Sequence, residues 1–124
     1  MRFVFKEKLN KGNTLVYRLF NDDDIPVGYS QIRLTAQKSD EMPEGFESHI
    51  YYEIYPDFQH KGFGTKLFND TITQAHDLGI ARITVVCDDL NFPSKKVIES
   101  AGGILLEQKK DKNGYIMNKY LFKS

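Results

Sequence analysis

The chain has 124 residues, of which 40% are hydrophobic and 13% aromatic, enough for one compact domain with its own core. Seventeen basic and seventeen acidic residues cancel, so the chain lacks the positive field that draws proteins onto nucleic acid or anionic membranes. The single cysteine, Cys87, cannot form an intramolecular disulfide, and no apolar run approaches the roughly 20 residues of a membrane span. We therefore expect one cytoplasmic domain over residues 1–124, with neither nucleic acid nor membrane as a partner.

Four stretches rich in aromatic and β-branched residues come first, separated by turn-forming residues. They predict mainly antiparallel strands at about residues 2–8, 14–20, 27–35 and 48–55. The longest connection runs from Thr35 to Glu47 and predicts a mobile surface loop near the functional site.

From Gly62 the apolar residues recur at helical spacing, and Gly79 ends this helix. Residues 81–87 predict a central strand covered on both faces. Asn91 opens a second, shorter helix, which Gly102 closes. Two strands joined by an Asn-Gly turn follow, at about residues 103–109 and 115–122. The predicted order is ββββαβαββ, an α+β fold with a mixed, mostly antiparallel sheet flanked by helices.

The start of the first helix is suited to binding an anion. The first four backbone amides of a helix have no partner inside it, and Gly62 and Gly64 lack the Cβ atoms that would keep a phosphate away. Lys61 adds a positive charge. Two common phosphate signatures do not fit, because Leu67 replaces the third glycine of the dinucleotide fingerprint, and Thr65 follows Gly64 where a P-loop needs lysine. This stretch alone is equally compatible with a plain tight turn.

Neighbouring segments favour a particular ligand. Gln59, Gly62 and Gly64 form a Gln-x-x-Gly-x-Gly pattern where a strand gives way to a helix, and the segment from Cys87 to Ser94 ends a strand and opens a short helix. With Val27-Gly-Tyr-Ser in the third strand, these segments resemble the GNAT superfamily of acyl-CoA N-acyltransferases. The resemblance covers about residues 27–110.

In GNAT proteins the helix after the fourth strand holds the cofactor pyrophosphate, and the fourth and fifth strands splay around the pantetheine. The resemblance implies that acetyl-CoA is the cosubstrate, without a metal, and that an amine of a small molecule or peptide receives the acetyl group by direct transfer in a ternary complex. Carried over by position, the implied cofactor-binding residues are Ile54, Gln59, His60, Lys61, Gly62, Phe63, Gly64, Thr65, Asn91 and Ser94.

Three features depart from the family pattern. His60 stands where glycine is common, and Ile98 stands where many members carry a tyrosine that serves as general acid. Only the segment from Asn10 to Asn13 separates the first two strands, where many members have two helices that shape the acceptor pocket. The acceptor side is then shortened, open or completed by a second subunit, and exposed edge strands would permit a homodimer. A non-catalytic acyl-CoA-binding or interaction module with the same fold is the alternative function.

Acetyl transfer to an amine needs a base, and the fourth strand carries two candidates. Glu53 is the candidate general base if it is buried in its aromatic strand beside the thioester, and a solvated or ion-paired sheet residue is an equal alternative. His49 is the alternative base, although a surface strand residue is the simpler interpretation. Cys87 could form a covalent acyl-enzyme, but a small buried side chain explains it more simply.

Overall fold

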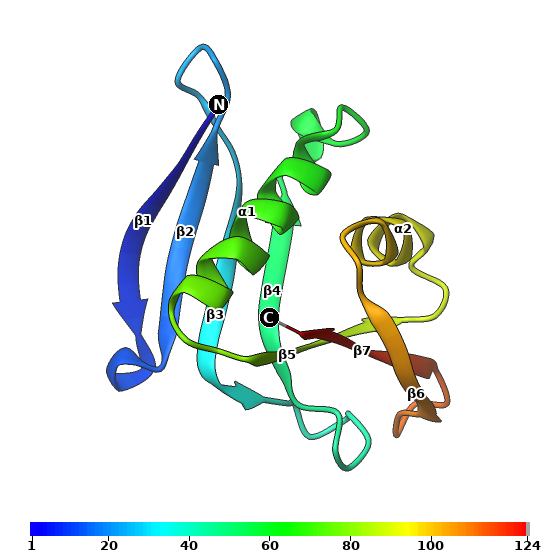
Figure 1. The fold of residues 1–124 in the computed structure, drawn as a ribbon. Helices are drawn as coiled ribbons and strands as arrows, with labels where there is room; N and C mark the ends of the chain where they lie inside the picture. Colours follow the sequence, from blue (N-terminus) through cyan, green and yellow to red (C-terminus); the bar gives the residue numbers. More distant parts are fainter. Residues whose placement is uncertain (124) are drawn as a thin grey trace.

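The computed structural model describes residues 1–123, and its elements follow the order ββββαβαββ (Figure 1). The strands are β1 (Arg2–Leu9), β2 (Thr14–Phe20), β3 (Pro26–Gln37), β4 (Ser48–Ile54), β5 (Arg82–Asp88), β6 (Ile104–Lys110) and β7 (Ile116–Lys123). The helices are α1 (Phe63–Asp77) and α2 (Phe92–Ser100), with short 3-10 helices η1 (Asn10–Gly12) and η2 (Pro56–Phe58). The predicted α+β class and element order are confirmed, and η1 alone joins β1 to β2. Neither α1 nor any other helix within residues 1–123 has the length and apolarity needed to cross a membrane.

The strands form two antiparallel sheets rather than one continuous sheet. The first has the order β1-β2-β3-β4 and the second the order β5-β7-β6. Side chains join the sheets where β4 and β5 begin: the Thr84 amide donates to Nδ1 of His49 (3.0 Å), and the Thr84 hydroxyl donates to the Glu47 carbonyl (2.9 Å). From this joint the two strands diverge toward their carboxyl ends (Figure 1). The structure therefore has a gap between β4 and β5 that is closed only at its base.

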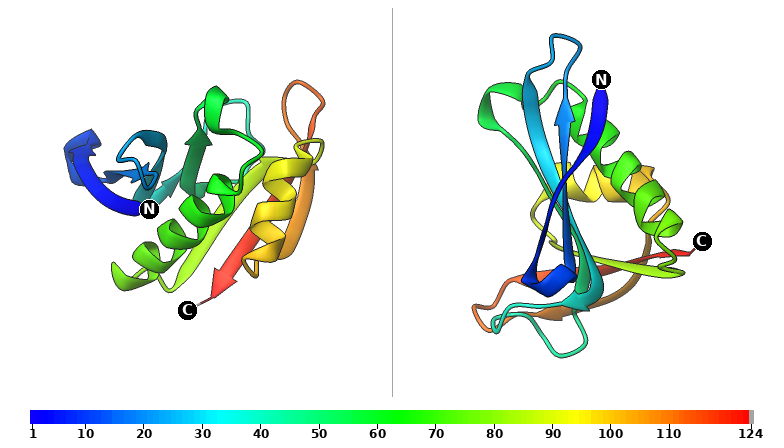
Figure 2. Two further views of the ribbon diagram at one scale, coloured as in Figure 1. Left: turned by 90° about the horizontal axis from the view of Figure 1, so that it is seen from above. Right: turned by 90° about the vertical axis from the view of Figure 1, so that its left-hand side faces the viewer.

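Both helices lie side by side over the strands (Figure 2). Phe68 of α1 is fully buried and packs against rings from both sheets, with centroids 5.2 Å from Tyr52 of β4 and 5.6 Å from Phe122 of β7. One continuous core therefore spans the two sheets, and its buried members include Leu15, Ile32, Ile50, Ile72, Ile83, Ile98 and Tyr120. Because burying such side chains is the main stabilising term of folding, this core holds the diverging strands in place.

The loop between β3 and β4 is anchored on the second sheet. Phe46 is 1% exposed, the Lys119 ammonium donates to the Gly45 carbonyl (2.7 Å), and the Lys112 amide donates to the Glu41 carbonyl (3.0 Å). These contacts oppose the mobility that the sequence led us to expect. The loop is held at these points and forms a wall beside the gap.

Candidate active site

The first turn of α1 presents free backbone amides. Gly62 is its N-cap, with φ of 86°, and no side chain within residues 1–123 caps this turn. A Cβ atom placed on Gly62 would meet no described atom within 4 Å beyond its chain neighbours, so the turn borders open space. At Gly64 a Cβ atom would lie 3.7 Å from the Ile54 side chain, which shows how closely α1 approaches β4. Free amides and the positive end of the helix dipole together favour an anion here.

The residues just before α1 shape this turn. Gln59 donates from Nε2 to the Ile54 carbonyl (3.0 Å), and the Lys61 ammonium lies 6.0 Å from the centre of the Phe58 ring. A carbonyl oxygen has two lone pairs, so Ile54 can still accept a second hydrogen bond. His60 has φ of 61°, in the left-handed region that favours glycine. A glycine, which the resembled motif commonly has at this position, would adopt this conformation without strain.

Two cavities, each of about 320 Å³, lead from this turn into the gap between the sheets. The first lies against the start of α1, and the second lies between β4 and β5. Tyr52, Asn91 and Ser94 line both cavities, which are therefore adjacent. We call the two cavities together the slot.

Most of the implied cofactor residues meet at the slot. Six of them line its first cavity: Ile54, Gln59, His60, Gly64, Asn91 and Ser94. The others belong to the turn and the first helical residues, and the Phe63 ring packs against Phe58, with centroids 6.3 Å apart, so its backbone is the part available to a ligand.

Tyr52 lines both cavities of the slot, and the sequence alone gives it no catalytic role. Its hydroxyl lies 3.3 Å from the Ser94 hydroxyl, while Asn91 caps α2 by accepting a hydrogen bond from the Ser94 amide (3.2 Å). Burial raises the pKa of Tyr52 above its usual value, so the phenol stays protonated at neutral pH. In the sequence, Tyr52 belongs to an aromatic run that could line a pocket or simply pack in the sheet, and the alternation of β4 places it on the same face as Ile50 and Ile54.

The sequence matches a family model described as an acetyltransferase (GNAT) domain over residues 2–104. The chain belongs to the GNAT acetyltransferase family. No curated protein sequence matches this GNAT chain significantly.

Solved structures with the GNAT fold resemble most of the chain. A mutant of the spermidine N-acetyltransferase SpeG from Vibrio cholerae has a TM-score of 0.74 at 13% identity, covering 92% of this chain and 68% of its own. RimL, a ribosomal L7/L12 α-N-protein acetyltransferase in complex with coenzyme A, has a TM-score of 0.69 at 18% identity, with coverages of 91% and 63%. The yncA protein of Salmonella typhimurium, with its cofactor acetyl-CoA, has a TM-score of 0.66 at 18% identity, with coverages of 89% and 64%. Such identities show a shared fold, and this GNAT chain spans about two thirds of the length of these structures.

The two candidate bases of this GNAT domain lie in different surroundings. Glu53 is exposed, not buried among aromatic residues, and it lines the first cavity of the slot. His49 is partly buried, and burial lowers its pKa. Because the Thr84 amide can only donate, Nδ1 of His49 must accept, and the proton of the neutral ring lies on Nε2. The lone pair that a base would use is therefore engaged in joining the two sheets.

Cys87 lines the second cavity, but its surroundings suppress its reactivity. Burial raises the pKa of Cys87 to about 11, so at neutral pH the side chain is a thiol and a weak nucleophile. Ile98, at the usual tyrosine position, is 1% exposed and supplies no acid.

Asp89, two residues after Cys87, has a structural role in the loop before α2. Asp89 accepts hydrogen bonds from the Lys95 ammonium and the Asn118 amide group, both at 2.9 Å. These bonds lower the pKa of Asp89 and tie the loop before α2 to β7. Within residues 1–123, no group of three or more His, Cys, Asp or Glu side chains could hold a metal ion.

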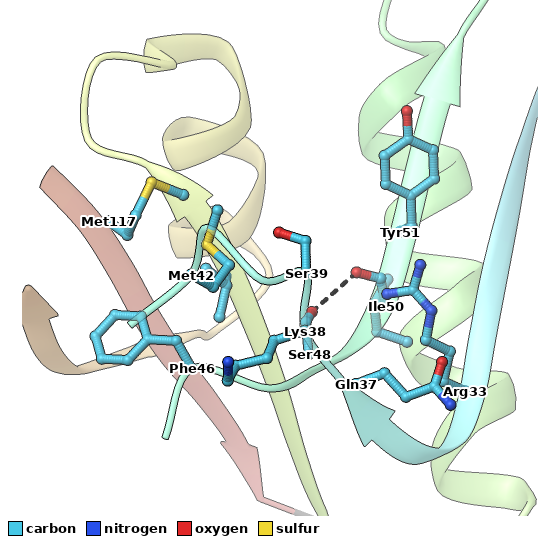
Figure 3. Close-up of a pocket in the computed structure, with 11 residues that line it drawn as sticks. Arg33, Gln37, Lys38, Ser39, Met42, Phe46, Ser48, Ile50, Tyr51 and Met117 are labelled. Atoms are coloured by element: carbon cyan, nitrogen blue, oxygen red, sulfur yellow. Dashed lines mark hydrogen bonds between the residues drawn. The ribbon is translucent and has the colours of Figure 1, made fainter. Parts of the chain in front are cut away.

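The slot continues into a third cavity of about 470 Å³ (Figure 3). The two spaces share Ile50, Tyr51, Val86 and Met117. The third cavity is bounded by the end of β3, the β3–β4 loop and the first residues of β4. A molecule in this cavity would therefore approach the gap from the side opposite the free amides of α1.

Proposed function

We propose that this protein is an N-acetyltransferase that moves the acetyl group of acetyl-CoA directly to an amine. The observation that carries this proposal is the continuous slot, which runs from the free amides of α1 to the gap between β4 and β5. Its two ends suit the two ends of coenzyme A, because the phosphates need hydrogen-bond donors and the pantetheine needs a narrow channel. When bound, acetyl-CoA supplies the activated acetyl group.

The chain's own residues then have distinct proposed roles. The amides of Gly62 to Thr65, with Lys61 and His60, bind the phosphates, and Ile54, Asn91 and Ser94 orient the pantetheine. Glu53 accepts the proton that the amine must lose. Tyr52 holds a proton at its hydroxyl in the middle of the slot. We propose that it is the general acid that protonates the departing thiolate, a role that Ile98 cannot perform. Direct transfer is favoured over an acyl-cysteine because Cys87 stays protonated.

Cofactor binding is tested by placing a carboxylate at the start of α1. Gly62→Glu should abolish measurable acetyl-CoA binding in calorimetry, because the new side chain repels the phosphates. Gly114→Glu is the matched control: Gly114 has the same φ of 86° and the same open surroundings, but lies in the turn between β6 and β7. Both variants incur similar backbone strain, of about 1–2 kcal/mol. Equal loss of binding in the two variants would refute the proposed phosphate site.

The base role is tested with Glu53→Gln. We expect turnover to fall by about 100-fold or more, the scale of general base catalysis, while acetyl-CoA affinity stays unchanged. Steady-state kinetics between about pH 6 and pH 9 would measure this, and turnover equal to that of the unmodified protein at every pH would remove Glu53 from the role.

A non-catalytic acyl-CoA-binding module is the second candidate. Ile98 at the usual tyrosine position and the short η1 connection favour it. Release of coenzyme A in the presence of amines, above the rate of hydrolysis without them, would distinguish the enzyme from the binding module.

A homodimer and a cytoplasmic location are further parts of the proposal. Balanced charge and the single cysteine support the cytoplasm, and they give no support to a nucleic acid partner. The edge strand β6 exposes Ile104, Leu105 and Leu106, which supports pairing with a second copy. Light scattering of the purified protein would give its mass and decide between monomer and dimer.

A further inference from the structure

The third cavity has two chemically different sides (Figure 3). One side carries cationic and polar side chains from the end of β3, Arg33 and Gln37, while the Lys38 side chain extends away from Arg33 toward Phe46. The other side carries apolar side chains from the β3–β4 loop and β7: Met42, Phe46 and Met117. Among residues 1–123, no Asp or Glu lines this cavity. Its polar side is therefore positively charged, although the whole chain is neutral.

An irregularity in the first sheet places Arg33 at the cavity. The β3–β4 ladder pairs Ile32 with Ile50 and then Gln37 with Ser48, so β3 advances five positions where β4 advances two. The extra residues begin at Arg33 and interrupt the regular pairing of β3 with β4. Bulges reorient side chains and are common beside active sites.

Among residues 1–123, the positive charges at this cavity have no acidic partner. Within residues 1–123, neither Arg33 nor Lys38 forms an ion pair, and the only side-chain hydrogen bond of Arg33 is a long one, 3.4 Å from its Nη2 to Oε1 of Gln31. Arg33 is nevertheless partly buried. A guanidinium presents five donors in a geometry that matches a carboxylate, so its free donors favour an anionic ligand.

We propose that the acceptor is a small amine that also carries a carboxylate and an apolar group, as an apolar amino acid does. This inference rests on the proposed acetyl transfer, and it narrows the acceptor of that reaction. The carboxylate binds Arg33, and the apolar group packs against Met42 and Phe46. The amine then faces the residues shared with the slot.

Two other classes of amine fit this cavity less well. A polyamine would bring positive charge against Arg33 and Lys38, with no carboxylate lining the cavity to attract it. A protein N-terminus has an amide in place of the carboxylate beside its amine, so it cannot form the ion pair with Arg33.

The test compares amines that differ in one group. Leucine carries both groups, isopentylamine is leucine without its carboxylate, leucinamide neutralises the carboxylate, glycine lacks the apolar group, and spermidine is a polyamine. We expect kcat/KM to be highest for leucine and lower by about 10- to 100-fold for isopentylamine and leucinamide, the range expected for the loss of one charge-assisted bidentate contact. Acetylation of spermidine, isopentylamine or leucinamide as efficiently as leucine would overturn the proposal.

Variants of Arg33 test the residue itself. Arg33→Gln should reduce kcat/KM for leucine about 10- to 100-fold, raise KM more than it lowers kcat, and leave isopentylamine unaffected. Arg82→Gln is the control, because Arg82 is exposed at the start of β5 and lies outside the three cavities. An Arg33→Gln enzyme that still prefers leucine over isopentylamine would overturn the assignment.

A binding measurement separates this inference from the proposed function. N-acetylleucine should bind the unmodified protein in calorimetry and bind Arg33→Gln at least about 10-fold more weakly. If N-acetylleucine binds in this way but acetyl-CoA does not, acetyl transfer fails while the anion-binding cavity stands. If acetyl-CoA binds and N-acetylleucine shows no dependence on Arg33, the acceptor proposal fails alone.

Discussion

His60 combines an unfavourable backbone conformation with a place at the proposed phosphate site. Its φ of 61° lies where a residue with a Cβ atom is strained, yet its side chain is exposed and lines the slot. The turn keeps this shape because Gln59 holds the Ile54 carbonyl on one side and Gly62 begins α1 on the other. His60 is thus either strained without a role in binding or strained while its imidazole contacts the phosphate.

Replacing His60 with glycine distinguishes these roles. His60→Gly should leave the free energy of unfolding unchanged or raise it by up to about 1 kcal/mol, because glycine adopts this φ freely. Lys61→Gly, at a residue whose φ is not positive, should lower it by about 0.5–1 kcal/mol. Urea unfolding would measure both, and calorimetry would show whether acetyl-CoA affinity falls when the imidazole is lost. Equal destabilisation by the two variants would contradict the strain argument.

The sequence predicted the residues of the slot better than the contacts among them. The glycine pattern and Asn91 could be recognised because backbone conformation and helix capping are local properties. The pairing of Tyr52 with Ser94 could not, because it joins residues 42 positions apart whose distance depends on how far β4 and β5 diverge. The exposure of Glu53 was likewise hidden, since alternation tells which face a residue occupies and not whether that face is covered.

Among the elements, the joint between β4 and β5 determines the geometry of the site. The sequence predicted both strands. The alternation of side chains along a strand, however, does not tell whether two strands pair in one sheet or belong to two separate sheets. The separation shows in the sheet topology, in which β4 and β5 belong to different sheets, and His49 and Thr84 connect the two strands near their starts. The closed end of the gap between β4 and β5 is therefore held by His49, which must remain neutral to accept the hydrogen bond from the Thr84 amide.

This joint should make stability depend on pH. Burial lowers the pKa of His49 from its usual value of 6.5, so below that pH the unfolded chain binds more protons than the folded one, and stability falls as the pH falls. In His49→Asn an amide oxygen can still accept the Thr84 amide but cannot be protonated. The loss of melting temperature between about pH 7.5 and about pH 5.5 should then be smaller than in the unmodified protein. His60→Asn, at an exposed site, is the control, and an equal change in both variants would contradict the role of His49.

At the scale of the whole molecule, a ligand in the slot would touch both sheets. Its phosphates would lie on α1 beside β4, and its pantetheine would lie against β5 and α2. We therefore expect acetyl-CoA at about 100 times its dissociation constant to add about 2.7 kcal/mol to the stability of the folded state, a rise in melting temperature of roughly 10 °C. ADP, which supplies only the phosphate end, should give less than half of this rise at the same concentration. A full shift with ADP alone would mean that the ligand does not bridge the sheets.

Within residues 1–123 the chain passes from the first sheet to the second only once, between the end of α1 and the start of β5. Each sheet is thus encoded by one uninterrupted segment, with α1 carrying the apolar surface that joins them. A break in the exposed Gly79 turn would leave every strand with its hydrogen-bonding neighbours and divide the protein into two pieces that share the Phe68 contacts. Such pieces could be produced separately and reassembled. The two walls of the slot could then be labelled independently in a split-protein design.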